Sequence, residues 1–220
     1  MKKIIIAAML ISTLPIFGQN HFVGVISGIN GTSVNSDYTF NNSTKRFGFK
    51  GGLTYQYLIN DKFSLDIELL YEQRGFKNDI SFINPSGDPI GPKENSEFYY
   101  DYLSFPIKAG YSIGNTFSGF VNLGIVPAYI VKAEIAVPTF GGSETFDNID
   151  RATSFDFGGL IEAGAAYAIM DRLIITASFA YQHSITTFSN PDYFSDSNMR
   201  HYGMSLSVGI KYALKKKGDL

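Results

Sequence analysis

The chain has 220 residues and a formal net charge of −2 at pH 7, and it contains neither cysteine nor tryptophan. The missing cysteines exclude disulfides, thiolate catalysis and Cys-ligated metal sites, and no basic patch points to a nucleic acid. Charged residues make up only 17% of the chain, whereas glycine, tyrosine and phenylalanine are abundant. The mean hydropathy of +0.01 is too low for a helical membrane protein. One all-β domain of this length is ordinary.

Residues 1–18 have the layout of a secretory signal peptide. Lys2 and Lys3 precede an apolar stretch from Ile4 to Leu14, and small or polar residues follow it. The stretch is shorter than the roughly 20 residues that a membrane-spanning helix needs. We expect export with cleavage after Gly18, which leaves residues 19–220 as one domain.

Segments in which apolar and polar residues alternate fill the rest of the chain, a pattern typical of β-strands. We predict strands at 21–31, 45–58, 62–76, 98–112, 117–132, 152–169, 173–187 and 200–214. Three of the intervening breaks are tight turns, "INDK", "IGNT" and "IMDR", which begin at 59, 113 and 169. The other breaks are long and polar, at 32–44, 77–97, 133–151 and 188–199. Within them, 84–97 and 137–150 are expected to be flexible connectors or a partner-binding surface.

Short turns at one end and long loops at the other are typical of an outer-membrane barrel. The last segment, "HYGMSLSVGIKYAL" (201–214), alternates an apolar face with a face of small and polar residues. Glycine is frequent on the polar face of several segments, as expected for a narrow lumen in which small residues must alternate with long ones. The apolar faces are therefore expected to meet lipid.

Aromatic residues gather at both ends of the predicted strands, as in the girdles of a membrane barrel. The set beside the short turns is Tyr57, Phe63, Tyr111, Phe117, Tyr167 and Tyr212. The set toward the long loops is Phe47, Tyr71, Tyr99, Tyr129, Phe155, Tyr181 and Tyr202.

The alternation also predicts a network of charged residues inside the barrel. Its members are Lys50, Asp66, Glu68, Glu72, Arg74, Lys108, Asp156, Glu162 and Lys211. Charges removed from water must pair, and eight strands leave room for little besides side chains. A closed lumen filled by ion pairs is the main hypothesis, and a narrow, weakly conducting pore is the alternative.

The segment "YDYLSFPIKAGYSI" (100–113) carries Tyr102, Leu103 and Pro106. It resembles the "YLEIPLLLKY" signature of PorT-type outer-membrane β-barrel proteins, also called the outer membrane protein β-barrel domain family. Ser104 stands where that signature usually has Glu, so no role of that acid carries over. The resemblance implies an eight-stranded outer-membrane barrel and says little about activity, although PorT itself is associated with a protein-secretion apparatus.

We therefore predict an all-β, eight-stranded, antiparallel up-and-down transmembrane β-barrel in the outer membrane of a Gram-negative-type bacterium, with both termini in the periplasm. We expect no enzyme, metal or cofactor: by parity His183 faces lipid and His201 the lumen, so these two histidines do not form one site. The leading function is a structural, surface-interaction or assembly role. The alternatives are a small porin-like channel, a membrane component of a secretion apparatus, and a soluble lipocalin-like carrier. Expected partners are outer-membrane lipid and a periplasmic or extracellular protein, with no nucleic acid.

Overall fold

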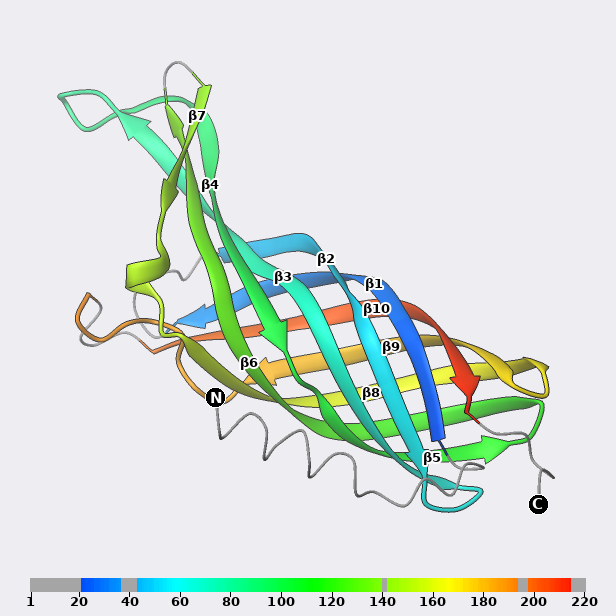
Figure 1. The fold of residues 1–220 in the computed structure, drawn as a ribbon. Helices are drawn as coiled ribbons and strands as arrows, with labels where there is room; N and C mark the ends of the chain where they lie inside the picture. The colour runs from blue at the N-terminus through cyan, green and yellow to red at the C-terminus, as the bar shows by residue number, and fades with distance from the viewer. Residues whose placement is uncertain (1–20, 37–42, 140–141, 194–197, 215–220) are drawn as a thin grey trace.

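The computed structural model describes residues 21–36, 43–139, 142–193 and 198–214 (Figure 1). The predicted signal peptide and the basic tail at 215–220 lie outside the described residues. The described elements are β1 (His21–Ser36), β2 (Ser43–Leu58), β3 (Phe63–Ile83), β4 (Pro89–Ser104), β5 (Ile107–Gly114), β6 (Phe117–Thr139), β7 (Gly142–Asp147), the 3-10 helix η1 (Ile149–Arg151), β8 (Phe155–Met170), β9 (Leu173–Ser184) and β10 (Met199–Ala213). Among the described helical residues, no segment has the length and apolar character to cross a membrane.

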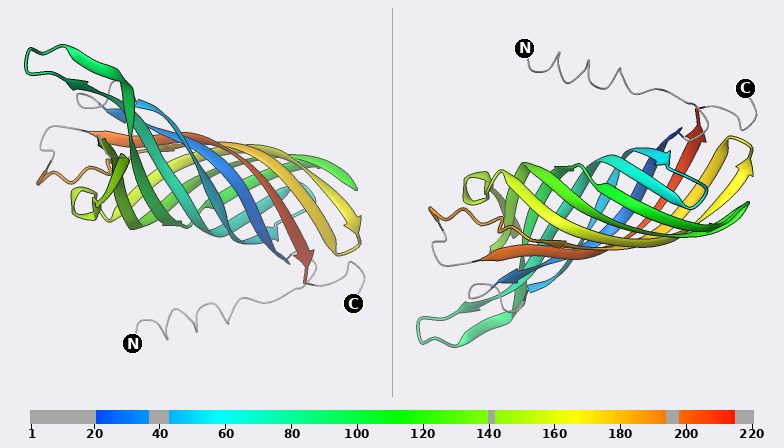
Figure 2. Two further views of the ribbon diagram at one scale, coloured as in Figure 1. Left: turned by 90° about the horizontal axis from the view of Figure 1, so that it is seen from above. Right: turned by 90° about the horizontal axis from the view of Figure 1, so that it is seen from below.

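The strands form one antiparallel sheet that winds around an interior (Figures 1 and 2). The pairings run from β1 to β2 and β3, through β4 and β5 to β6, and on to β8, β9 and β10, which pairs again with β1, so they return to their start. The predicted tight turns are confirmed between β2 and β3, β5 and β6, and β8 and β9. We call this end of the barrel the turn end and the opposite end the loop end.

The predicted count of eight strands describes positions around the ring and not the individual strands. The predicted strand 98–112 is broken at Phe105 and Pro106 into β4 and β5, which both pair with β3 and β6. Proline has no N–H to donate to the ladder, so regular pairing is interrupted there. The short strand β7 pairs only with β6 and lies outside the ring.

Two of the predicted loops are largely β-structure. β3 continues to Ile83 and β4 begins at Pro89, whereas 77–97 was expected to be a loop. Likewise β6 continues to Thr139 and pairs with β7 within the expected loop 133–151. These four segments form a second region, the protruding sheet (77–83, 89–97, 133–139 and 142–147), which rises from one side of the barrel in Figure 1.

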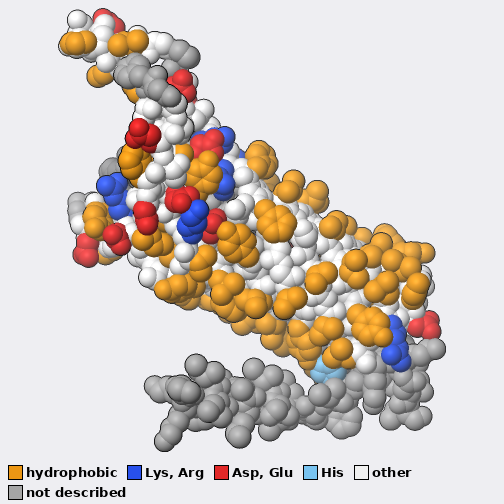
Figure 3. Space-filling model, turned by 45° about the horizontal axis from the view of Figure 1, so that its top comes forward, with side chains coloured by type: hydrophobic (Ala, Val, Ile, Leu, Met, Phe, Trp, Pro, Cys, Tyr) orange, Lys and Arg blue, Asp and Glu red, His pale blue; other side chains and the backbone are white. Residues whose placement is uncertain are grey.

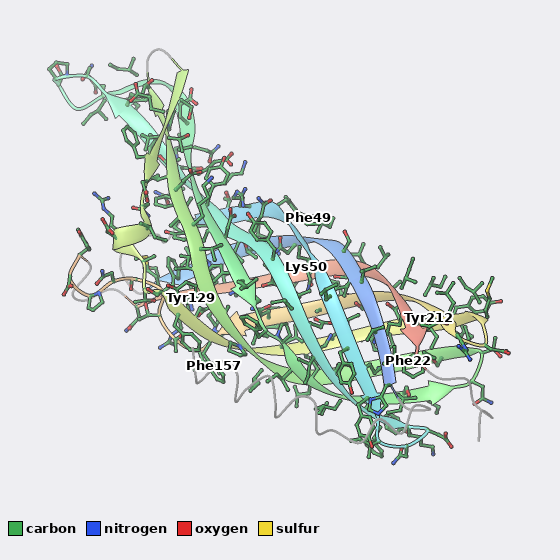
Figure 4. The ribbon with its side chains drawn as sticks, in the orientation of Figure 1. Phe22, Phe49, Lys50, Tyr129, Phe157 and Tyr212 are labelled. Atoms are coloured by element: carbon green, nitrogen blue, oxygen red, sulfur yellow. The ribbon has the colours of Figure 1, made fainter. Side chains whose placement is uncertain are left out.

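The outer wall of the barrel is apolar. Phe49 on β2 is exposed, whereas its neighbour Lys50 is buried, so the two side chains point to opposite sides of the wall (Figure 4). Figure 3 shows hydrophobic side chains along the barrel and charged side chains gathered near the protruding sheet. An apolar band below a charged region is the pattern of a barrel embedded in lipid.

Candidate functional site

The interior of the barrel is filled by layers of side chains, and β3 contributes to each of them. Its inward residues, in order from the turn end, are Ser64, Asp66, Glu68, Leu70, Glu72, Arg74 and Phe76, all of them buried. Alternation along a strand sends every second side chain inward. The layers are described below from the turn end to the loop end.

The first layer is an ion pair at the turn end. Lys211 on β10 donates to the fully buried Asp66 at 2.9 Å. Ser64 and Gln56 donate to the other oxygen of the same carboxylate, at 2.8 and 3.1 Å. A cavity of about 180 Å³ opens below this layer, with Lys211 and Phe120 among its lining residues.

The second layer holds one cation between two carboxylates. The Nζ atom of Lys108 lies 2.6 Å from Glu68 and 2.8 Å from Glu162, and all three residues are buried. Asn122 donates a further hydrogen bond to Glu162 at 2.7 Å. Because Lys108 is shared, removing its charge would leave two buried carboxylates without a cation.

The third layer is apolar on one side of the interior, between the two charged layers. Leu70 and Val126 are fully buried, and Leu160 and Ala180 are nearly so. None of these side chains can bind water or an ion. They lie on β3, β6, β8 and β9, whereas the inward residues of β2 and β10 near this height are glycine or polar, among them Gly52, Thr54 and Ser207.

The fourth layer is an ionic cluster around Arg74. Its guanidinium donates to Glu72 at 2.7 Å and to Asp156 at 2.8 Å. Ser104 accepts a hydrogen bond from Arg74 at 3.1 Å and donates one to Glu72 at 2.9 Å. Lys50 approaches Glu72 at 3.8 Å. The two cations and two carboxylates compensate one another within the layer.

The contacts of Ser104 were not predicted from the sequence. It stands at the motif position usually held by Glu, and its buried hydroxyl joins Arg74 to Glu72. A third carboxylate at this position would add a negative charge to a layer whose two cations already match two carboxylates. The departure from the motif therefore suits the electrostatics of this interior.

The fifth layer closes the loop end and is called the aromatic cap (Phe76, Tyr100, Tyr102, Phe188 and His201). Phe188 comes from the segment between β9 and β10 and stacks on His201, with ring centroids 4.0 Å apart. Its backbone accepts from the Thr153 N–H and donates to Met199, at 2.8 and 2.9 Å. The cap is held by main-chain hydrogen bonds as well as by ring packing.

The structure places every charged residue of the predicted network inside the barrel. Lys211 is the most accessible, with its side chain 15% exposed, and the others are buried. Of the predicted girdle aromatics, Tyr99 and Tyr202 are half-buried and the rest are exposed on the outer wall. Within the family motif, Tyr102 is fully buried with the Arg74 guanidinium 4.5 Å from its ring centroid, Leu103 is half-buried, and Pro106 lies at the break between β4 and β5.

The sequence did not single out several interior residues. Gln56 and Asn122 are polar residues of the predicted strands, but they carry no charge and so were not included in the predicted charge network. Phe188 lies in a predicted loop, where no alternation could indicate an inward direction. Only the pairing of distant strands brings these side chains together.

The described residues hold no metal-binding cluster, and His183 and His201 lie apart. No group of three or more His, Asp or Glu side chains there could hold a metal ion. His201 lies in the aromatic cap, whereas His183 packs beside Tyr181, with ring centroids 6.5 Å apart. The two histidines do not share a site.

Several solved structures resemble the chain in fold. Neisserial surface protein A is 17% identical, covering 87% of this chain and 96% of its own, with a TM-score of 0.45. OprG from Pseudomonas aeruginosa is 12% identical, covering 89% and 96%, with a TM-score of 0.46. The outer membrane protease OmpT from Escherichia coli is 10% identical, covering 91% and 98%, with a TM-score of 0.44.

The sequence comparisons are more specific. No curated protein sequence matches the chain. The family model described as "Outer membrane protein beta-barrel domain" matches residues 17–190. This match spans most of the barrel, from before β1 to beyond Phe188. The chain belongs to the outer membrane protein β-barrel domain family.

Proposed function

We propose that this protein is a sealed, non-enzymatic barrel of the outer membrane, which acts through its protruding sheet at the cell surface and not by transport. In this arrangement the turn end faces the periplasm, residues 1–18 are the signal peptide, and the exposed aromatic residues mark the two membrane interfaces. Family membership and the apolar outer wall support the location. The soluble carrier considered from the sequence is not in keeping with this family.

The observation that carries the proposal is the pairing of the buried charges across the interior. The apolar layer lies between the Lys108 layer and the Arg74 layer, and the aromatic cap lies beyond them. An ion crossing the barrel would have to pass the aromatic cap and then the Arg74 layer, whose charges already compensate one another. The porin-like alternative requires a path through this layer, and a secretion-apparatus role rests only on the PorT resemblance.

Single-channel recording tests the proposal. The mature protein is refolded in planar bilayers, with heat-shifted gel mobility as the check on folding. We expect a folded barrel with no stable current steps. The double variant Leu70→Gly/Leu160→Gly, which removes two side chains of the apolar layer, serves as the control for a leak that the method can detect. Stable steps in the unaltered protein that shrink in Lys108→Met would overturn the sealed-barrel proposal in favour of a pore.

A further inference from the structure

The protruding sheet is split between β4 and β6. Pairing between these strands ends at Glu97 and Ala136. Beyond this point β4 pairs only with β3, and β6 pairs only with β7. The two hairpins leave a cleft of about 540 Å³ between them, which we call the slot. Its lining residues are Glu94, Asn95, Glu97, Tyr99, Ala136, Pro138, Thr139, Gly142 and Ser143.

The β4 wall of the slot is an unpaired strand edge. Residues 93–96 of β4 have no described strand on the side away from β3, whereas Pro89 and Pro92 before them have no N–H to donate. The opposite wall, 137–139 of β6, also lacks a partner on the side that faces β4. An edge of this kind presents a row of free N–H and C=O groups to an incoming chain. Because Pro138 interrupts the β6 wall, residues 93–96 of β4 offer the main template for an added strand.

The slot is acidic. Glu94 is exposed and joins no ion pair among the described residues. Glu97 accepts hydrogen bonds from Lys77 at 2.6 Å and from Tyr99 at 2.8 Å, so its charge is partly met. Glu144 on β7 is also exposed, next to the lining residue Ser143. Basic side chains on an incoming strand would meet these carboxylates.

We propose that the slot binds an extended, basic segment of another protein, which adds to the β4 edge as a further strand. This proposal rests on the proposed function, because it names the class of partner that the protruding sheet recognises. Main-chain hydrogen bonds to residues 93–96 supply affinity, and Lys or Arg side chains facing Glu94 supply specificity.

A second copy of this chain fits the slot less well. The exposed edges that it could offer are β4 and β7, which carry four carboxylates (Glu94, Glu97, Glu144 and Asp147) against one lysine, Lys93. Like charges placed opposite one another on adjacent strands are destabilising. The geometry of the edge would allow self-pairing, but its charge favours a basic partner.

The test uses the full mature chain, folded in detergent micelles, and synthetic peptides as probes. The first probe is an eight-residue peptide of alternating Lys and Val with blocked ends. The second is the same peptide N-methylated at alternate residues, which removes N–H donors but keeps the charge. We expect saturable binding of the first and at least about tenfold weaker binding of the second, since an added strand depends on its main-chain bonds. A Glu-Val peptide should not bind.

Two matched variants test whether the bound peptide contacts the slot. Glu94→Gln should weaken the Lys-Val peptide several-fold, whereas Asp88→Asn, an exposed carboxylate just before β4 that does not line the slot, should leave binding unchanged. Bound peptide should also slow amide exchange at alternate residues of 93–96. Equal binding of the N-methylated peptide, or equal losses in both variants, would overturn the slot as a strand-binding site. Concentration-dependent dimers without peptide binding would overturn the basic partner and indicate self-pairing. A conducting barrel contradicts the proposed function independently of these results.

Discussion

Strand β3 runs through two regions, the barrel interior and the protruding sheet, in which charged side chains differ in their exposure to water. Inside the ring, Glu72 and Arg74 are buried, and their ion pair is part of a compensated layer. A few residues further, in the protruding sheet, the Lys77–Glu97 pair has side chains 34% and 28% exposed. The same strand therefore contributes first to a closed interior and then to a surface that water and partners can reach.

The difference in exposure between the two ion pairs predicts which of them contributes to stability. An exposed ion pair is worth about 0–1 kcal/mol, because water solvates both partners when the pair separates. Breaking a buried pair by removing one partner costs about 3–5 kcal/mol, because the other charge stays buried. We expect substitutions in the ring to lower stability and substitutions in the protruding sheet to alter recognition instead.

The largest effect is expected from Arg74→Met. The change leaves Glu72 and Asp156 buried without their shared cation, and we expect it to lower the free energy of unfolding by about 4 kcal/mol. The measurement is equilibrium unfolding in urea, with folded barrel detected by heat-shifted gel mobility.

The matched control for Arg74→Met is Lys45→Met on β2, which removes an exposed cation near the same end of the barrel. It should change stability little. Equal destabilisation by both substitutions would show that net charge, and not the buried cluster, governs stability.

A somewhat smaller effect is expected from Leu70→Ala in the apolar layer. Leu70 is fully buried, and its truncation leaves a cavity that should cost about 3 kcal/mol of unfolding free energy. Leu69, its neighbour on the outer wall, is 40% exposed, so Leu69→Ala in a micelle provides the control and should cost clearly less. A greater loss for Leu69 would mean that the outer wall contributes more than the interior layer.

The strands of the ring could be predicted from the sequence because the alternation of inward and outward side chains depends only on neighbouring residues. Alternation from Phe63 to Phe76 defines inward and outward faces without knowledge of any partner strand. The same rule placed Lys108 and Glu162 inward, although it could not show that Lys108 contacts both Glu68 and Glu162. Those contacts depend on the register between strands that are distant in sequence.

The protruding sheet was not predicted from the sequence because its strands contain both residues that favour turns and the alternation typical of strands. Segments 77–97 and 133–151 are rich in Gly, Pro, Asn and Asp, which favour turns. Ile80 and Phe82 nevertheless continue the alternation of β3 and pair across to β4. Pairing with β2 and β4, which starts within the barrel, extends these strands beyond the point at which local preference would end them.

The smallest effect is expected from pH at the Lys77–Glu97 pair. The hydrogen bond from Lys77 holds the pKa of the Glu97 carboxyl below its ordinary value, with a further contribution from Tyr99. A lowered folded-state pKa means that the pair stabilises the protruding sheet above the ordinary glutamate pKa of about 4.3, and that this contribution is lost as pH falls through the lower folded value.

Carboxyl NMR of Glu97 in the micelle-bound protein should therefore show a midpoint below that of a model peptide. In Lys77→Met the midpoint should rise, while the unfolding free energy at pH 7 should change little, because the pair is partly solvated. An unchanged midpoint would mean that Lys77 does not hold Glu97 in solution, and the slot would then present two carboxylates without a paired cation, Glu94 and Glu97, to a basic strand.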